Sequence, residues 1–189
     1  MKIGILGGTF NPPHIGHIVL AKDISKQLKL DKVFFVPTNI PPHKENYNVS
    51  TSARLDMIRL AIAENETFEI LDIEIERGGI SYTVDTIGEL RGRYPEDDFY
   101  LMVGSDLAKG FSTWKDFSEL QKMVKIVVAN RENYPLGDKN DFIIADITQI
   151  DISSSQIRDM VREGESVEEF VKKNVLDYID QHKLYKNIN

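Results

Sequence analysis

The fold can be inferred from one stretch, Gly7-Gly8-Thr9-Phe10-Asn11-Pro12-Pro13-His14-Ile15-Gly16-His17. The residues before it, Lys2 to Leu6, form an apolar run that predicts a short buried strand. The residues after it, from Ile18 onward, begin an apolar pattern with helical spacing. The stretch is therefore predicted to be a strand-to-helix turn, the place where α/β proteins bind anions.

The residue types within this turn favour a phosphate ligand. Gly7 and Gly8 allow a ligand to approach the backbone closely, and the two prolines stiffen the turn. His14 and His17 are three positions apart, so on a helix their imidazoles share one face, which Gly16 leaves open. Taken alone, two histidines at a helix start could equally cap the helix, pack in the core or bind a metal ion.

Length and composition limit the alternatives. The 189 residues suit a single domain (1–189) with a helical C-terminal part at about 153–189, and the net charge of −7 argues against nucleic acid and anionic membranes as partners. The absence of cysteine excludes disulfides and thiolate metal sites and suits a reducing compartment. No apolar run approaches the roughly 18 residues of a membrane helix. We therefore expect a soluble, cytoplasmic protein.

Strand-like and helix-like segments alternate along the rest of the chain. Strands are predicted at 2–6, 32–37, 68–75, 99–103, 125–129 and 142–145. Helices are predicted at about 14–28, 52–63, 83–93 and 116–123, from Ser153 onward, and as two short segments within 167–185. This alternation predicts an α/β protein with a Rossmann-like, doubly wound parallel sheet and helices on both faces.

Polar clusters follow several of the predicted strands. They are the opening turn, His43-Lys44, Asp106, Arg131 and the serines at 153–155. Ligands of doubly wound sheets bind at the carboxyl ends of the strands, so we expect these clusters to converge on one site. None offers an activated nucleophile, since the serines lack a Gly-x-Ser-x-Gly context. Positioning and charge stabilisation are sufficient for a transfer that consumes ATP, with Mg²⁺ held mainly by the ATP phosphates and water.

The opening turn resembles the signature of the nucleotidylyltransferase superfamily, with its His-x-Gly-His core. Ile152-Ser153-Ser154-Ser155-Gln156-Ile157-Arg158 resembles the second motif of that superfamily, with Ser155 where Thr is preferred. Three more stretches resemble the bacterial nicotinate-mononucleotide adenylyltransferases: Pro41-Pro42-His43-Lys44, Ser81-Tyr82-Thr83-Val84-Asp85-Thr86, and Gly104-Ser105-Asp106 with Trp114 following. The resemblance covers essentially the whole chain.

This resemblance implies transfer of AMP from ATP to nicotinate mononucleotide, by direct attack of the mononucleotide phosphate and without a covalent enzyme intermediate. It implies catalytic roles for His14, His17 and Arg158. The implied ATP-binding residues are Gly7, Gly8, Thr9, Phe10, His14, His17, Gly104, Asp106, Ile152, Ser154 and Arg158. Of these, the resemblance implies that Gly104 and Asp106 bind the adenosine ribose. The implied mononucleotide-binding residues are Lys44, Thr83, Trp114, Lys115 and Arg131, and no residue is expected to hold a metal ion directly.

Several alternatives stay open at this point. The chain could be a nicotinamide-mononucleotide, pantetheine-phosphate or other adenylyltransferase of the same superfamily, or a catalytically silent nucleotide-binding module. Trp114 could be a core residue, Asp106 a helix cap, Lys44 a solvated loop residue, and Ser153 a cap only. Lys115 stands where some relatives carry an aromatic residue, and the flank of Arg131 departs from the usual Arg-Pro-Gly. The sequence leaves open whether the protein forms a homo-oligomer.

Overall fold

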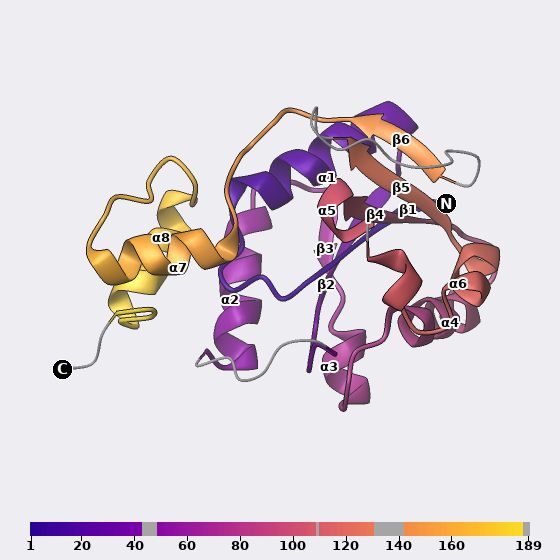
Figure 1. The fold of residues 1–189 in the computed structure, drawn as a ribbon, viewed down its shortest axis with the longest axis horizontal. Coiled ribbons are helices and arrows are strands. Elements are labelled where there is room, and N and C mark those ends of the chain that lie inside the picture. The colour runs from indigo at the N-terminus through magenta and orange to yellow at the C-terminus, as the bar shows by residue number, and fades with distance from the viewer. Residues whose placement is uncertain (43–48, 109, 131–141, 187–189) are drawn as a thin grey trace.

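A six-stranded sheet forms the centre of the protein (Figure 1). The computed structural model describes residues 1–42, 49–108, 110–130 and 142–186. All strand pairs are parallel, in the order β3-β2-β1-β4-β5-β6, which is the strand order of the Rossmann fold. The strands are β1 (Lys2–Gly8), β2 (Lys32–Pro37), β3 (Phe68–Ile70), β4 (Asp98–Gly104), β5 (Lys125–Asn130) and β6 (Phe142–Asp146). The predicted doubly wound parallel sheet is confirmed.

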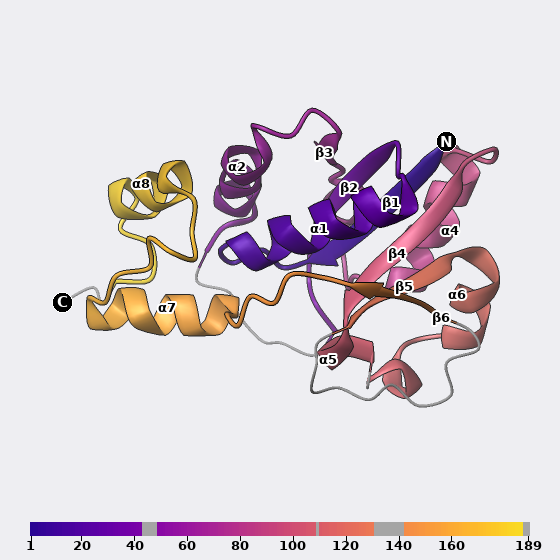
Figure 2. The same ribbon diagram turned by 90° about the horizontal axis from the view of Figure 1, so that it is seen from above.

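Helices cover both faces of this sheet (Figure 2). α1 (Ile15–Leu28) and α2 (Thr51–Ile62) share one apolar cluster with Leu6 of β1. α4 (Thr83–Arg93) and α6 (Phe117–Met123) share a second cluster with Ile3 and Ile5 of the same strand. Successive side chains of β1 thus alternate between two cores, as expected for a strand covered on both sides.

Two further helices extend the first of these cores. α7 (Ser154–Glu163) and α8 (Lys173–Gln181) lie beyond α2, at one end of the molecule (Figures 1 and 2). Val175 and Ile179 of α8 are fully buried in the same apolar cluster as Met57 of α2. The beginning of α7 lies against the turn that follows β1, although the two segments are far apart in sequence.

The predicted strand at 68–75 is wrong in its second half. β3 ends at Ile70, and the chain then forms the short helix α3 (Ile73–Arg77). The Leu71 amide still donates to the Phe35 carbonyl at 3.0 Å. The next backbone N–H that β2 would donate to this ladder belongs to residue 37. That residue is proline and has no N–H, so the ladder stops and Ile73 is buried by a helix instead.

The C-terminal and central connections also differ from expectation. Of the two helices predicted within 167–185, only α8 forms, because 167–171 makes a single turn in which the Phe170 and Val171 amides bond to the Val167 carbonyl. A lone turn of this length does not propagate into a helix. Conversely, no helix is predicted between 103 and 116, yet this segment contains α5 (Ser105–Ala108) and a 3₁₀ turn, η1 (Phe111–Thr113).

Candidate active site

The turn between β1 and α1 is held in one conformation by its own aromatic residue. Phe10 has a φ of +51°, in the left-handed region that bulky side chains rarely adopt, and it is 1% exposed. Its ring lies against the Gly8 backbone, where a Cβ would be only 3.1 Å from the ring, and packs 5.7 Å from the Phe35 ring. Gly7, by contrast, is exposed, and a Cβ there would meet nothing. The backbone before the turn is therefore open for a ligand.

The two histidines of the turn lie in contact, with ring centroids 3.7 Å apart. The His14 amide donates to Nδ1 of His17 at 3.2 Å, so a neutral His17 carries its proton on Nε2. Burial, assisted by the neighbouring His14, holds the pKa of His17 well below its usual value. A side chain on Gly16 would come within 3.0 Å of the His14 ring, which explains glycine at that position. His17 is thus a neutral hydrogen-bond donor near pH 7.

The beginning of α7 contacts the same turn through Ser154 and Arg158. Ser154 Oγ donates to the Pro12 carbonyl at 2.8 Å. Arg158 donates from Nη1 to the Asn11 carbonyl at 2.8 Å and from Nη2 to Ser155 Oγ at 3.0 Å. These bonds use only part of the guanidinium, which has several more N–H donors for an anion. Ile152 is buried in the first core, and Ser153 caps the helix by accepting from the Gln156 amide, as predicted.

A third element of the site follows β4, the neighbour of β1 in the sheet. The strand order reverses between β1 and β4, and ligands of such sheets bind at this switch point. Gly104 ends β4, and a Cβ there would lie 2.5 Å from Oδ1 of Asp106. The Asp106 carboxylate therefore folds back over Gly104, and it is exposed to solvent. Only glycine at 104 permits this position of the carboxylate.

The residues expected to bind the mononucleotide ring lie at the beginning of α4 and just after η1, and an ion pair joins these two segments. Thr83 is the first residue of α4, and Trp114 follows η1 and packs edge-on at 5.1 Å from Phe111. Trp114 is only half-buried, so part of its indole belongs to the second core and part is accessible. Lys115 bridges the segments: its Nζ lies 3.0 Å from Asp85 of α4 and 4.7 Å from the centre of the Tyr82 ring. Lys44 and Arg131 lie outside the described residues.

Two residues at this site were missed by sequence reasoning. Arg54 is 2% exposed and donates from Nη1 to the Thr9 carbonyl at 3.0 Å. Tyr185 donates its hydroxyl proton to Oδ1 of the buried Asn11 at 2.7 Å. The signal for Arg54 was available, because an arginine occupies the inward stripe of α2 that otherwise holds Ala53, Met57 and Ile58. Tyr185 gave no such signal, since its contact spans almost the whole chain.

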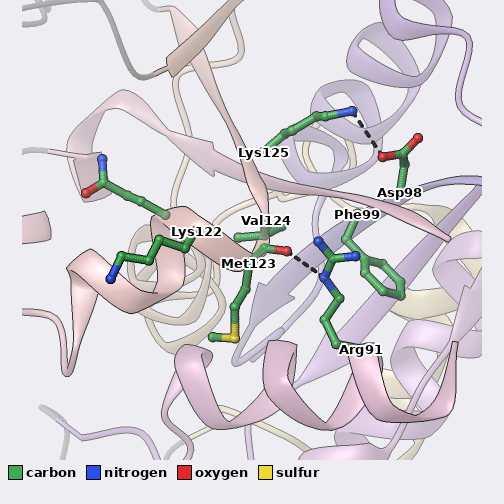
Figure 3. Close-up of a pocket in the computed structure, with 8 residues that line it drawn as sticks. Arg91, Asp98, Phe99, Lys122, Met123, Val124 and Lys125 are labelled. Carbon is green, nitrogen blue, oxygen red and sulfur yellow. Dashed lines mark hydrogen bonds and ion pairs between the residues drawn. The ribbon is translucent and has the colours of Figure 1, made fainter. Parts of the chain in front are cut away.

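A separate hollow of about 150 Å³ lies at the opposite end of the sheet (Figure 3). It is lined by the beginnings of β4 and β5 and by α4 and α6, and it carries several cations. These cations are already engaged: Lys125 with Asp98 at 3.1 Å, Lys122 with Glu119 at 2.7 Å, and Arg91 with the Met123 carbonyl at 2.9 Å. The hollow lies at the amino ends of β4 and β5, whereas ligands of doubly wound sheets bind at the carboxyl ends of the strands.

The described residues contain no group of three or more His, Cys, Asp or Glu side chains that could hold a metal ion. None of the helices in the described ranges is both long and apolar enough to cross a membrane.

The strand order, the histidine-bearing turn at the switch point and the opposing arginine define a nucleotide-binding α/β protein of the Rossmann-like class.

Comparisons with known proteins refine this class. Residues 5–160 match the model of the family described as cytidylyltransferase-like. A relative from Oceanobacillus iheyensis, named "probable nicotinate-nucleotide adenylyltransferase", is 38% identical over 184 residues, which are 97% of this chain and 96% of the relative. A relative of the same name from Lactiplantibacillus plantarum is 41% identical over 186 residues, covering 98% of this chain and 88% of the relative.

The fold has a counterpart among solved structures. Nicotinic acid mononucleotide adenylyltransferase from Plasmodium falciparum, solved in complex with NaAD, superposes with a TM-score of 0.85 over 97% of each chain, at 20% identity. At that identity the likeness shows the fold alone. The chain belongs to the cytidylyltransferase-like family and, within it, to the nicotinate-nucleotide adenylyltransferases.

Proposed function

We propose that the turn at 7–17 and the beginning of α7 hold the triphosphate of ATP between them, while Thr83 and Trp114 receive the ring of the mononucleotide. As a nicotinate-nucleotide adenylyltransferase, the protein transfers AMP from ATP to nicotinate mononucleotide and releases nicotinate adenine dinucleotide and pyrophosphate. The observation that carries the assignment of the site is the contact of Ser154 and Arg158 with the carbonyls of Pro12 and Asn11. These contacts join the two motifs, which supports a single phosphate site between them.

The reaction needs no nucleophile from the protein. A phosphate oxygen of the mononucleotide attacks the α-phosphorus of ATP, a new P–O bond forms, and the bond to the bridging oxygen breaks with its electron pair leaving on pyrophosphate. In this proposal, Nε2–H of His17 donates to a phosphate oxygen, and Arg158 stabilises the charge that develops on the leaving group. Fixed donors in a partly water-excluded site stabilise such charge strongly because they need no reorganisation.

Charge balance requires a divalent cation, which we propose to be Mg²⁺. Among the described residues, no group of three or more His, Cys, Asp or Glu side chains could form a cage of protein ligands for the cation. Mg²⁺ suits this arrangement because it keeps several waters and binds largely through substrate phosphates. The cation would thus arrive as part of the ATP complex. Since ATP is the substrate and the sequence has no cysteine, we propose the cytoplasm as the location of the reaction.

The preference for an acid over an amide is supported by the beginning of α4. The first N–H groups of a helix and its dipole favour a negative charge, and Thr83 is the first residue of this 11-residue helix. Asp85 in the same turn would oppose an anion, but its carboxylate is paired with Lys115 at 3.0 Å. The ion pair leaves the helix N-terminus suited to the carboxylate of nicotinate.

The function is tested by incubating the protein with ATP and MgCl₂ together with either nicotinate or nicotinamide mononucleotide. Pyrophosphate and the dinucleotide product are quantified in parallel by an enzymatic assay and by chromatography. We expect both products in equal amounts and a higher kcat/KM for the nicotinate substrate. Faster turnover of the amide would overturn the substrate assignment, and ATP binding without pyrophosphate release would identify a silent nucleotide-binding module.

A further inference from the structure

The C-terminal segment reaches back to the turn at 7–17 and bonds to it at two places. The Phe170 carbonyl accepts from the amide of Ile15, which is one of the first N–H groups of α1 and has no partner within the helix. The Tyr185 hydroxyl donates to Oδ1 of Asn11 at 2.7 Å. These contacts join residues at the two ends of the chain, and neither is required by the parallel sheet.

The backbone around Tyr185 adopts conformations that direct its ring toward the turn. Lys183 has a φ of +51° and Tyr185 a φ of +64°, both in the left-handed region. Non-glycine residues rarely adopt that region, and they persist there only where the surroundings enforce it. The chain therefore turns back sharply after α8, and this turn brings the hydroxyl of Tyr185 to Asn11.

Asn11 links this contact to the proposed ATP site. Its side chain is 3% exposed and is held by Tyr185, while its carbonyl accepts from Nη1 of Arg158 at 2.8 Å. A displacement of Asn11 would therefore change the position of Arg158 relative to the histidines, which follow Asn11 in the same turn. Small displacements of groups that bind a transition state are costly, because their contribution depends on geometry.

We propose that Tyr185 is a positioning residue for adenylyl transfer, which fixes Asn11 and thereby the separation of Arg158 from His14 and His17. This inference rests on the proposed roles of Arg158 and the histidines. The positioning role belongs to the hydroxyl, which bonds to Asn11. The ring has a separate role, because it packs against the first core near Met57, with Oη 3.9 Å from Sδ. Burial raises the pKa of Tyr185, so the hydroxyl keeps its proton and acts as the donor throughout the working pH range.

The test compares Tyr185→Phe with the matched control Tyr178→Phe. Tyr178 lies on α8 in the same C-terminal segment, and its hydroxyl donates to Asp56 of α2 at 3.2 Å rather than to the turn. Both variants keep their rings and lose one hydrogen bond. We expect Tyr185→Phe to lower kcat by about tenfold, since a net hydrogen bond of about 1.4 kcal/mol corresponds to a factor of ten. KM for the mononucleotide should stay unchanged, and Tyr178→Phe should retain the wild-type rate.

Hydrogen–deuterium exchange supplies a readout that does not depend on activity. In Tyr185→Phe the amides of residues 9–17 should exchange several-fold faster than in the wild type, whereas Tyr178→Phe should leave them unchanged. A wild-type kcat in Tyr185→Phe, an equal loss in both variants, or unchanged exchange in the turn would each overturn the inference. If the wild type itself forms no dinucleotide, the proposed function fails, and the exchange experiment still decides whether Tyr185 holds the turn.

Discussion

Replacing Arg158 by lysine separates the charge of this residue from its geometry. The guanidinium bonds at once to the Asn11 carbonyl at 2.8 Å and to Ser155 Oγ at 3.0 Å, from two different nitrogens. A lysine ammonium is a single donor centre and cannot span both acceptors while also binding phosphate in a bidentate manner. The variant keeps the positive charge but loses at least one charge-assisted hydrogen bond in the transition state.

The expected magnitude follows from the strength of such a bond. A hydrogen bond to a charged group contributes about 1.5–3 kcal/mol, and about 1.4 kcal/mol is a factor of ten, so kcat/KM for ATP should fall by roughly 10- to 150-fold. The assay is initial-rate pyrophosphate release at saturating mononucleotide, below the melting temperature of the variant. Arg158→Met, which also removes the charge, should lose more.

The control for this experiment is Arg162→Lys. Arg162 lies one turn further along α7, and its partner is Asp159 at 2.8 Å, with both side chains about half exposed at 48% and 58%. Exposed pairs of this kind contribute little, so the control should keep its rate within about twofold. Wild-type kcat/KM in Arg158→Lys, or an equal loss in both variants, would refute the role given to Arg158.

Three further predictions concern pH, the ribose side of the site and substrate choice. The pKa of His17 is lowered in the folded state, so as pH falls below about 6.5 only the unfolded chain takes up this proton. The contribution of His17 to the free energy of unfolding should therefore fall by up to about 1.4 kcal/mol per pH unit below pH 6.5 and stay constant above it. His17→Gln should reduce the change in melting temperature between pH 7 and pH 5.5. Gly104→Ala should raise KM for ATP by about tenfold, because its Cβ would lie 2.5 Å from the Asp106 carboxylate and displace it. An unchanged KM would show that ATP binding does not depend on this position of the carboxylate. Lys115→Met should leave Asp85 unpaired at the beginning of α4. The ratio of kcat/KM for nicotinate mononucleotide to kcat/KM for nicotinamide mononucleotide should then fall by about threefold. An unchanged ratio would show that the ion pair plays no part in selectivity.

The sheet was predictable because its strands carry local signals. β2 was expected at 32–37 and α4 at 83–93, and both agree with the structure to the residue. Fully apolar runs bounded by turn residues are the pattern of buried parallel strands, and they need no information from elsewhere in the chain. The meeting of the opening turn with the serines at 153–155 was predictable from topology, because both follow strands of one parallel sheet.

The errors arose where a partner strand or a distant residue decides the structure. The end of β3 depends on Pro37 of its neighbour, which the pattern at 68–75 cannot show. The bonds that hold the turn come from Arg54 on α2 and from Tyr185 near the C-terminus. Side chains that bond to polar groups across the molecule follow no spacing rule. The sequence therefore predicts which residues bind phosphate, but it does not indicate which residues hold them in place.

In the proposed site, one triphosphate lies between the turn at 7–17 and the beginning of α7. This arrangement is tested most directly by a crystal structure of the protein with Mg²⁺ and a non-hydrolysable ATP analogue. We predict phosphate oxygens at hydrogen-bond distance, about 2.7–3.2 Å, from Nε2 of His17 and from the guanidinium of Arg158, with the ribose hydroxyls at Asp106. A triphosphate bound elsewhere, for example against Arg91 and Lys125 at the opposite end of the sheet, would contradict this arrangement.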